Sequence, residues 1–150
     1  MPPFRFRLST LQHLRENVRD ECRQQLAEAQ RAEDILIARI AELDQEIAFI
    51  RQQSKTASQV GPINVDRLLD AGRYEMALRA ERLSVVSQRE TVALEVERRR
   101  QALVEADREV KSLEKLRERQ LERHRHEEGR RESKQLDAIA VQSGFAREEA

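Results

Sequence analysis

The chain has 150 residues, of which 37% are charged and 3% aromatic, and it contains no Trp. So little bulky apolar material excludes a conventional globular core, whereas a narrow seam between long helices needs none. Lys plus Arg and Asp plus Glu each total 28, so no net charge draws the protein to nucleic acid or to an anionic membrane.

Helix-breaking residues divide the chain into two long segments. Pro and Gly occur only as Pro2-Pro3, Gly61-Pro62, Gly72, Gly129 and Gly144. The segments between them are rich in Arg, Glu, Gln, Leu and Ala, which lose little side-chain entropy in a helix. We predict an all-α protein with a single domain over residues 1–150. Its expected parts are a first helix at about 4–58, a turn at about 59–64, a second helix at about 65–128, and a helical or disordered extension over 129–150.

The first segment carries a heptad seam, because apolar residues recur at alternating steps of three and four. Its members are Leu26, Ala29, Leu36, Ile40, Leu43, Ile47 and Ile50, with Glu33 as a polar interruption. Upstream, Phe4, Leu8, Leu11, Val18 and Cys22 extend the stripe through a stutter. Ser9 or Thr10 could cap a helix start, although Phe4 and Leu8 fit the stripe well enough for an earlier one.

The second segment repeats the pattern after a turn. Gly61-Pro62 ends the first helix, and Asn64 or Asp66 can cap the second. The second seam comprises Val85, Val92, Val96, Leu103, Ala106, Val110 and Leu113, with Arg89 and Arg99 at seam positions and Leu116 and Leu121 after them. A reversal near residue 61 should place Ile50 opposite Tyr74, Cys22 opposite Arg99, and Phe4 opposite residues 116–121. The prediction is therefore an antiparallel coiled-coil hairpin within one chain.

After Leu121 come fourteen residues without an apolar side chain, ERHRHEEGRRESKQ. This stretch should have nothing to pack against within the chain, so it is either an exposed helix or a disordered tail. Leu136, Ile139, Ala140 and Phe145 then form a short amphipathic pattern without an intramolecular mate. Such an unpaired stripe is typical of a docking element.

No constellation of catalytic residues can be assembled on a two-helix hairpin, so an enzyme is not expected, and neither is a cofactor or metal. We interpret as solvated surface, and not as a metal site, the group His124, His126, Glu127 and Glu128. Residues two apart on a helix do not share a face. Cys22 is interpreted as a packing residue. The Arg98–Arg100 cluster is interleaved with Glu nearby and lacks aromatic neighbours, which favours a solvated face. No stretch approaches the ~20 apolar residues of a membrane span, and a cytoplasmic location is expected.

Several segments together resemble the flagellar type III export protein FliJ. They are the opening FRFRLSTLQHLRE, the Ala/Glu/Arg-rich first helix, RYEMALRAERL around Tyr74, and the late RRESKQLDAIA. The most specific residues are Phe4, Phe6, Leu8 and Leu11 at the start, and Glu132, Lys134, Leu136, Asp137 and Ala140 near the end.

The resemblance implies an antiparallel two-helix coiled coil, similar to the central stalk of rotary ATPases, that is not an enzyme. It implies that the paired termini enter the pore of the export ATPase hexamer, that the hairpin links this ring to the cytoplasmic domain of the membrane export gate, and that export chaperones are further partners. The protein would then meet the membrane only through partners, at its cytoplasmic face. Carried onto this sequence, the ATPase-facing residues are Phe4, Phe6, Leu8, Leu11, Leu136 and Asp137. The gate-facing residues are Leu43, Ile50, Tyr74 and Leu78.

Three alternatives remain open at this point. Injectisome stalk proteins have the same architecture. A structural coiled-coil adaptor would self-associate through its apolar stripes and sediment as a stable dimer. A nucleic-acid-associated coiled coil would bind phosphates through its Arg clusters, with an affinity that falls steeply with salt.

Overall fold

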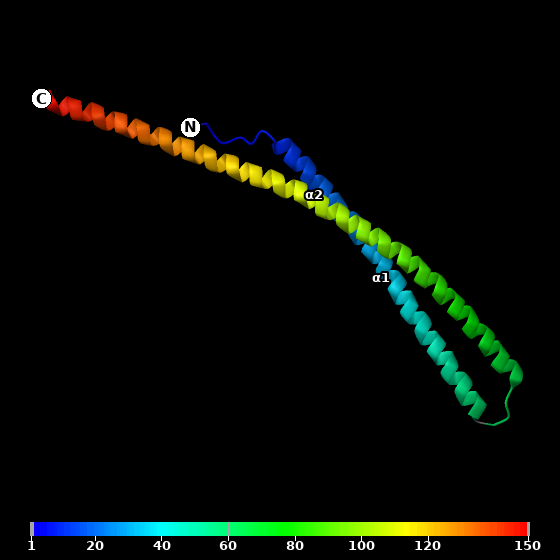
Figure 1. Cartoon of the computed structure of the whole chain (residues 1–150). Coiled ribbons are helices and arrows are strands. Elements are labelled where there is room, and N and C mark those ends of the chain that lie inside the picture. The colour runs from blue at the N-terminus through cyan, green and yellow to red at the C-terminus, as the bar shows by residue number, and fades with distance from the viewer. Residues whose placement is uncertain (1, 60, 150) are drawn as a thin grey trace. The chain divides into compact units, whose positions relative to one another are not determined.

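A computed structural model describes residues 2–59 and 61–149, and all regular secondary structure in these ranges is helical (Figure 1). Helix α1 spans Ser9–Gln59, 51 residues, and helix α2 spans Val65–Glu148, 84 residues. The two helices make many contacts with each other. The predicted fold class, two long helices forming an antiparallel hairpin, is confirmed.

The turn between the helices uses the predicted residues. Gly61 has a φ of 81°, a left-handed conformation that glycine adopts without steric cost. Asn64 caps α2, because its Oδ1 accepts a hydrogen bond from the backbone N of Arg67 at 3.3 Å. Asp66 lies in the first turn of α2, where a negative charge suits the helix dipole. Asn64 rather than Asp66 is therefore the cap.

The first helix begins at Ser9, so the predicted start at about residue 4 was wrong. The first helical hydrogen bond runs from Gln12 N to the carbonyl oxygen of Leu8 at 2.8 Å. Before it, Phe4, Phe6 and Leu8 are all at least half-buried, while Arg5 and Arg7 between them are exposed. Residues 2–6, called here the extended segment, are not helical, and their shielded phenylalanines alternate with the exposed Arg5 as on an extended chain. A turn at Arg7 and Leu8, closed by a hydrogen bond from Ser9 N to the carbonyl oxygen of Phe6 at 3.2 Å, then leads into α1.

Helix α2 continues through Gly129 and Gly144, so residues 129–148 extend the helix predicted to about residue 128 without a break. A glycine in a helix interior costs roughly 1 kcal/mol relative to Ala, which the flanking helix-favouring residues can offset. Of the two options for residues 129–150, the helical one holds as far as Glu148.

The chain separates into two compact units, residues 20–104 and residues 1–19 with 105–150. In the unit of residues 20–104, the core consists of Leu43, Ile47, Ile50, Leu78 and Val85, with Leu36, Ile40 and Ala71 packed against it. Arg51 pairs with Glu75, Arg39 with Glu81, and Arg99 with the carbonyl oxygen of Gln25. Partner numbers rise on α2 as they fall on α1, so the helices are antiparallel in the predicted register.

The second unit has its own buried side chains, Phe6, Ala106 and Val110. Its two segments are joined by an ion pair from Nη1 of Arg15 to Oε2 of Glu109 at 2.7 Å. Each unit thus contains a length of both helices and a small core of its own. The prediction of one domain over residues 1–150 stays a prediction.

The hairpin can be checked in solution with cysteines at positions 50 and 74, in a Cys22→Ser background. Ile50 and Tyr74 line one hollow, so we expect a disulfide within a single chain. Non-reducing electrophoresis at low protein concentration should show a faster-migrating monomer. Crosslinks found only between chains would contradict the hairpin.

Candidate functional site

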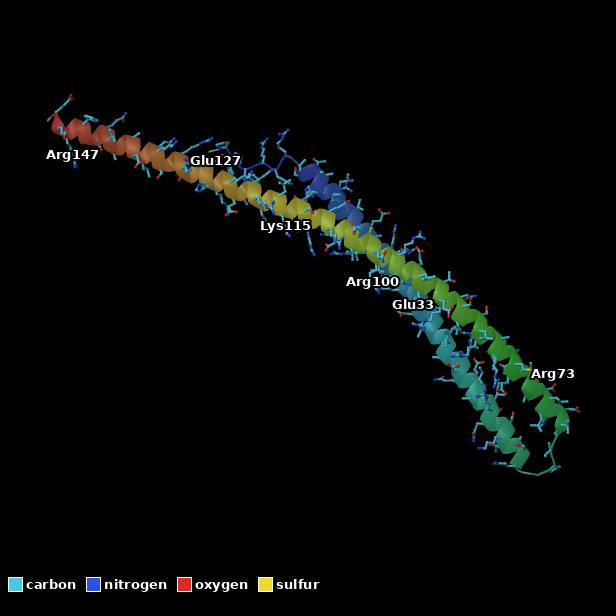
Figure 2. All side chains as sticks on the ribbon, in the orientation of Figure 1. Glu33, Arg73, Arg100, Lys115, Glu127 and Arg147 are labelled. Atoms are coloured by element: carbon cyan, nitrogen blue, oxygen red, sulfur yellow. The ribbon has the colours of Figure 1, made fainter. Side chains whose placement is uncertain are left out.

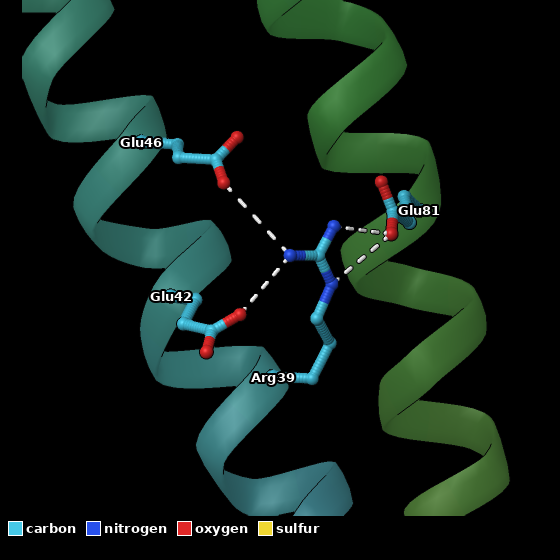
Figure 3. Close-up of polar contacts among 4 residues, drawn as sticks. All are labelled: Arg39, Glu42, Glu46 and Glu81. Atoms are coloured by element: carbon cyan, nitrogen blue, oxygen red, sulfur yellow. Dashed lines mark hydrogen bonds and ion pairs between the residues drawn. The ribbon is translucent and has the colours of Figure 1, made fainter.

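The inter-helix surface of the first unit is organised around Arg39, which extends from α1 toward α2 (Figure 3). Its Nη2 lies 2.7 Å from Oε1 of Glu81 on α2, and its Nη1 lies 3.1 Å from Glu42 and 3.8 Å from Glu46. Hydrogen bonds to Glu81 and then Glu42 raise the pKa of Arg39 above its ordinary value. These carboxylates therefore favour the charged guanidinium, and the pair of Arg39 with Glu81 joins α1 to α2.

The polar seam positions predicted from sequence are paired with one another or with the backbone. Glu33, the polar interruption of the first seam, lies 3.9 Å from Arg89 of the second. Arg99 donates from Nη1 to the carbonyl oxygen of Gln25 at 2.6 Å and from Nε to Glu95 at 2.9 Å. Both arginines keep their charged groups at the seam's edge, where partners and water reach them.

The four predicted gate-facing residues differ in exposure. Leu43, Ile50 and Leu78 belong to the core, so their side chains are not surface groups. Tyr74 is 55% exposed and, with the 61% exposed Phe49, borders a hollow of about 480 Å³. The floor of this hollow includes Ile50 and Ala71, and Glu46, Gln53 and Ser54 complete its lining. A partner would meet two aromatic rings over an apolar floor.

The predicted ATPase-facing residues fall into a packed group and an exposed group. The Phe4 ring lies 5.7 Å from the His124 ring, tilted by 43°, and Phe6 is buried. Leu8 is half-buried and Leu11 exposed. Leu136 and Asp137 are exposed on α2. A hollow lined by Pro2 and by Glu128, Arg131, Glu132 and Gln135 places the start of the extended segment beside the residues just before Leu136.

The stretch after Leu121 does pack within the chain, which corrects the expectation that it has no mate. His124 contacts Phe4, and its Nε2 lies 3.0 Å from Oε1 of Glu128 one turn further along α2. The side chains of His124 and Glu128 are both largely shielded. Figure 2 labels Glu127 in this stretch and Arg147 near the far end of α2. Phe4 and Leu8 were interpreted as part of a helical stripe that omits Phe6, and the polar residues around His124 gave no sequence signal for this contact.

Two other kinds of site are absent from the residues that the structure describes. Residues 2–59 and 61–149 contain no group of three or more His, Cys, Asp or Glu placed to hold a metal ion. Within the same ranges, neither helix is apolar enough over a sufficient length to cross a membrane.

Comparison with known families is decisive. The family model described as "Flagellar FliJ protein" matches residues 4–149, nearly the whole chain. The chain belongs to the FliJ family. Neither the search of curated proteins nor that of solved structures found a significant match.

Membership of this family makes the chain a flagellar export-related protein, and the family is a non-enzymatic one. The match includes the extended segment from Phe4 onward and the exposed helix beyond residue 129. Both lie in the unit of residues 1–19 and 105–150.

Proposed function

We propose that the chain links the export ATPase hexamer to the cytoplasmic domain of the membrane export gate, assists export chaperones, and catalyses no reaction itself. It would act in the cytoplasm and meet the membrane only through partners. The observation that carries this proposal is the family match over residues 4–149, which includes both proposed binding surfaces.

The proposed ATPase-binding surface is the end of α2. Residues 129–148 are exposed along their whole length, although they include Leu136, Ile139, Val141 and Phe145. Burying apolar surface in a partner yields roughly 25 cal/mol per Å², so these side chains favour a partner that surrounds the helix. The pore of a hexameric ring is such an environment. Asp137 would supply a charge among the apolar contacts.

The extended segment would support the ATPase-binding surface without forming most of its contacts. Phe4 and Phe6 are occupied by contacts within their unit, so they hold the segment on α2 instead of presenting free rings. Leu8 continues this row, and Leu11 on the first turn of α1 is exposed and can touch the ring. The N-terminal residues would thus brace α2 where it enters the pore.

The proposed gate-binding surface is the hollow bordered by Phe49 and Tyr74. Aromatic side chains at the centre of an interface often carry a large share of the binding energy. Leu43, Ile50 and Leu78 would support these rings from the core. Because the matching family is a flagellar one, we favour the flagellar gate over the injectisome gate.

The gate surface can be tested with the double substitution Tyr74→Ala and Phe49→Ala. Both rings are more than half exposed, so the helices should keep their stability. We expect binding to the gate's cytoplasmic domain to weaken by roughly 30-fold or more in a calorimetric titration. Stimulation of the ATPase should be unchanged.

A matched control is Ile35→Ala, which removes an exposed apolar side chain elsewhere on α1 and should leave gate binding intact. Undiminished gate binding by the double variant would eliminate the hollow as the binding surface. Loss of both activities, with a lower melting temperature, would indicate misfolding instead.

A further inference from the structure

Helix α2 has a second row of apolar side chains that the intramolecular seam does not use. Five of its large apolar residues in the unit of residues 20–104 are between 54% and 75% exposed. They are Val65, Leu69, Met76, Leu83 and Leu94, called here the outer stripe. Its side chains are not part of the hollow bordered by Phe49 and Tyr74.

The outer stripe is straight and lies opposite the core. Successive residues of an α-helix are rotated by about 100°, so the five members fall within about 40° of one another. By the same rotation, Leu78, Val85 and Val96 of the buried seam lie about 160–180° away. From Val65 to Leu94 the stripe is about 44 Å long. On the side opposite the core, a surface helix normally carries polar residues.

The residues around the outer stripe would allow another helix to pack against it. Along the same face, small residues alternate with the large ones, since Ala80 lies between Met76 and Leu83, and Ser87 between Leu83 and Leu94. Gly72 precedes Met76, and no heavy atom other than its immediate helical surroundings lies within 4 Å of where its Cβ would be. Large side chains next to small ones form the knobs and holes by which helices interlock.

We propose that the outer stripe is the contact surface between two copies of this chain, which pair antiparallel through their α2 helices. With a two-fold axis between Ala80 and Leu83, each Leu83 faces Ala80 of the second copy. Met76 then faces Ser87, and Leu69 faces Leu94. Leu69, Met76, Leu83 and Leu94 thus each meet a small side chain or another leucine, while Val65 lies opposite Arg98. Each contact occurs twice, as an isologous interface requires.

Charges beside the outer stripe agree with the same register. Arg73, labelled in Figure 2, lies opposite Glu90 of the second copy in this arrangement. In the single chain Arg73 has a weak ion pair, 4.0 Å to Asp70, with both side chains at least 77% exposed. The Arg73–Glu90 pair would form on both sides of the axis. In a parallel arrangement each of these residues would face its own copy, a like-charge contact.

This pairing leaves each hairpin intact, because the buried seam stays within its own chain. It also leaves the hollow with Tyr74 free, since Tyr74 lies about 160° around α2 from the outer stripe. The contact strip is a single helix face, so we expect an interface at the small end of the usual range and roughly micromolar dissociation.

Sedimentation equilibrium of the full chain over a concentration series tests the proposal. The weight-average mass should rise from 17.5 kDa toward twice that value. Leu83→Glu should raise the dissociation constant at least about tenfold, because the charge would be buried against Ala80 of the second copy. Ile35→Glu is the matched control, since Ile35 and Leu83 are both 69% exposed, and it should dimerise normally.

Spin labels on single cysteines, in a Cys22→Ser background, test the direction of pairing. Labels at position 94 should be about 40 Å apart in the antiparallel dimer and about 10 Å apart in a parallel one. A constant monomer mass up to millimolar concentration would overturn the proposal, even if a chaperone or other partner bound this face. Equal dimerisation by Leu83→Glu, or a short distance at position 94, would also overturn it.

Discussion

Replacing Leu43 with Ala should lower the free energy of unfolding by about 2–4 kcal/mol, a large fraction of the total for a small protein. Leu43 is 0% exposed and lies in the core of the unit of residues 20–104. The truncation would remove its contacts with neighbours on both helices and leave a cavity that two stiff helices fill poorly. Thermal and urea unfolding followed by circular dichroism would measure the loss.

Alanine substitutions at two other leucines serve as comparisons for the Leu43 variant. Leu103 is a half-buried seam residue, so Leu103→Ala should cost less than Leu43→Ala. Leu94 is 75% exposed, and at low protein concentration Leu94→Ala should change the free energy of unfolding by no more than about 0.5 kcal/mol. Equal midpoints for the Leu43 and Leu94 variants would mean that the seam is misassigned.

Deleting residues 132–150 should abolish stimulation of the export ATPase while leaving most of the helical signal. The deleted part is exposed throughout Glu132–Glu149, so its removal takes little from either core. It does take away Leu136, Ile139, Val141 and Phe145, the apolar side chains proposed to enter the ring. Steady-state ATP hydrolysis by the ATPase with and without the chain is the measurement.

Point substitutions distinguish the loss of apolar ring contacts from the mere shortening of α2. Leu136→Asp with Phe145→Asp keeps α2 at full length and should reduce stimulation as strongly as the deletion. Ile35→Asp is a control, since it changes a similarly exposed apolar residue outside the proposed ring contact and outside the outer stripe. Full stimulation by the truncated chain would place the ATPase contact elsewhere and refute this part of the proposed function.

The seam was predictable because each helix has one partner. In a hairpin, a residue's burial follows from its position in the heptad, so Ala29, Leu43, Ile47, Val85, Val96 and Val110 could be assigned to the core from spacing alone. The turn was predictable for a similar reason, because Gly61 and Asn64 have strong local preferences. Local signals that agree with the tertiary contact are what make a sequence easy to interpret.

The N-terminal segment was missed because two periods fit the same residues. Phe4, Leu8 and Leu11 are spaced as on a helix, whereas Phe4, Phe6 and Leu8 alternate as on an extended chain. The helical interpretation leaves Phe6 outside the stripe, yet Phe6 is buried. The contact of Phe4 with His124 could not be foreseen, since a charged, polar stretch gives no apolar signal of burial.

The proposed binding surfaces were only partly accessible to sequence reasoning. Heptad position identified Leu43 and Ile50 as seam residues near the turn, and the family resemblance added Leu78. Neither source distinguishes a core residue from a contact residue. Exposure makes that distinction, and it selects Tyr74 and Phe49. The outer stripe escaped notice because α2 is apolar on opposite faces, and the stronger pattern of the buried seam obscured the weaker one.

The antiparallel pairing also determines the order in which the contacts between the helices form during folding, because it sets the length of the loop that each contact closes. Arg51 and Glu75 are 24 residues apart in sequence, Arg39 and Glu81 are 42 apart, and Arg99 and Gln25 are 74 apart. Since the entropy lost on closing a loop grows with loop length, unassisted pairing begins near the turn and spreads along the chain. The contact between Phe4 and His124 closes a longer loop than these three, so it forms after them and opens before them. A partner that grips the chain ends thus acts on the contacts whose opening least disturbs the rest of the hairpin.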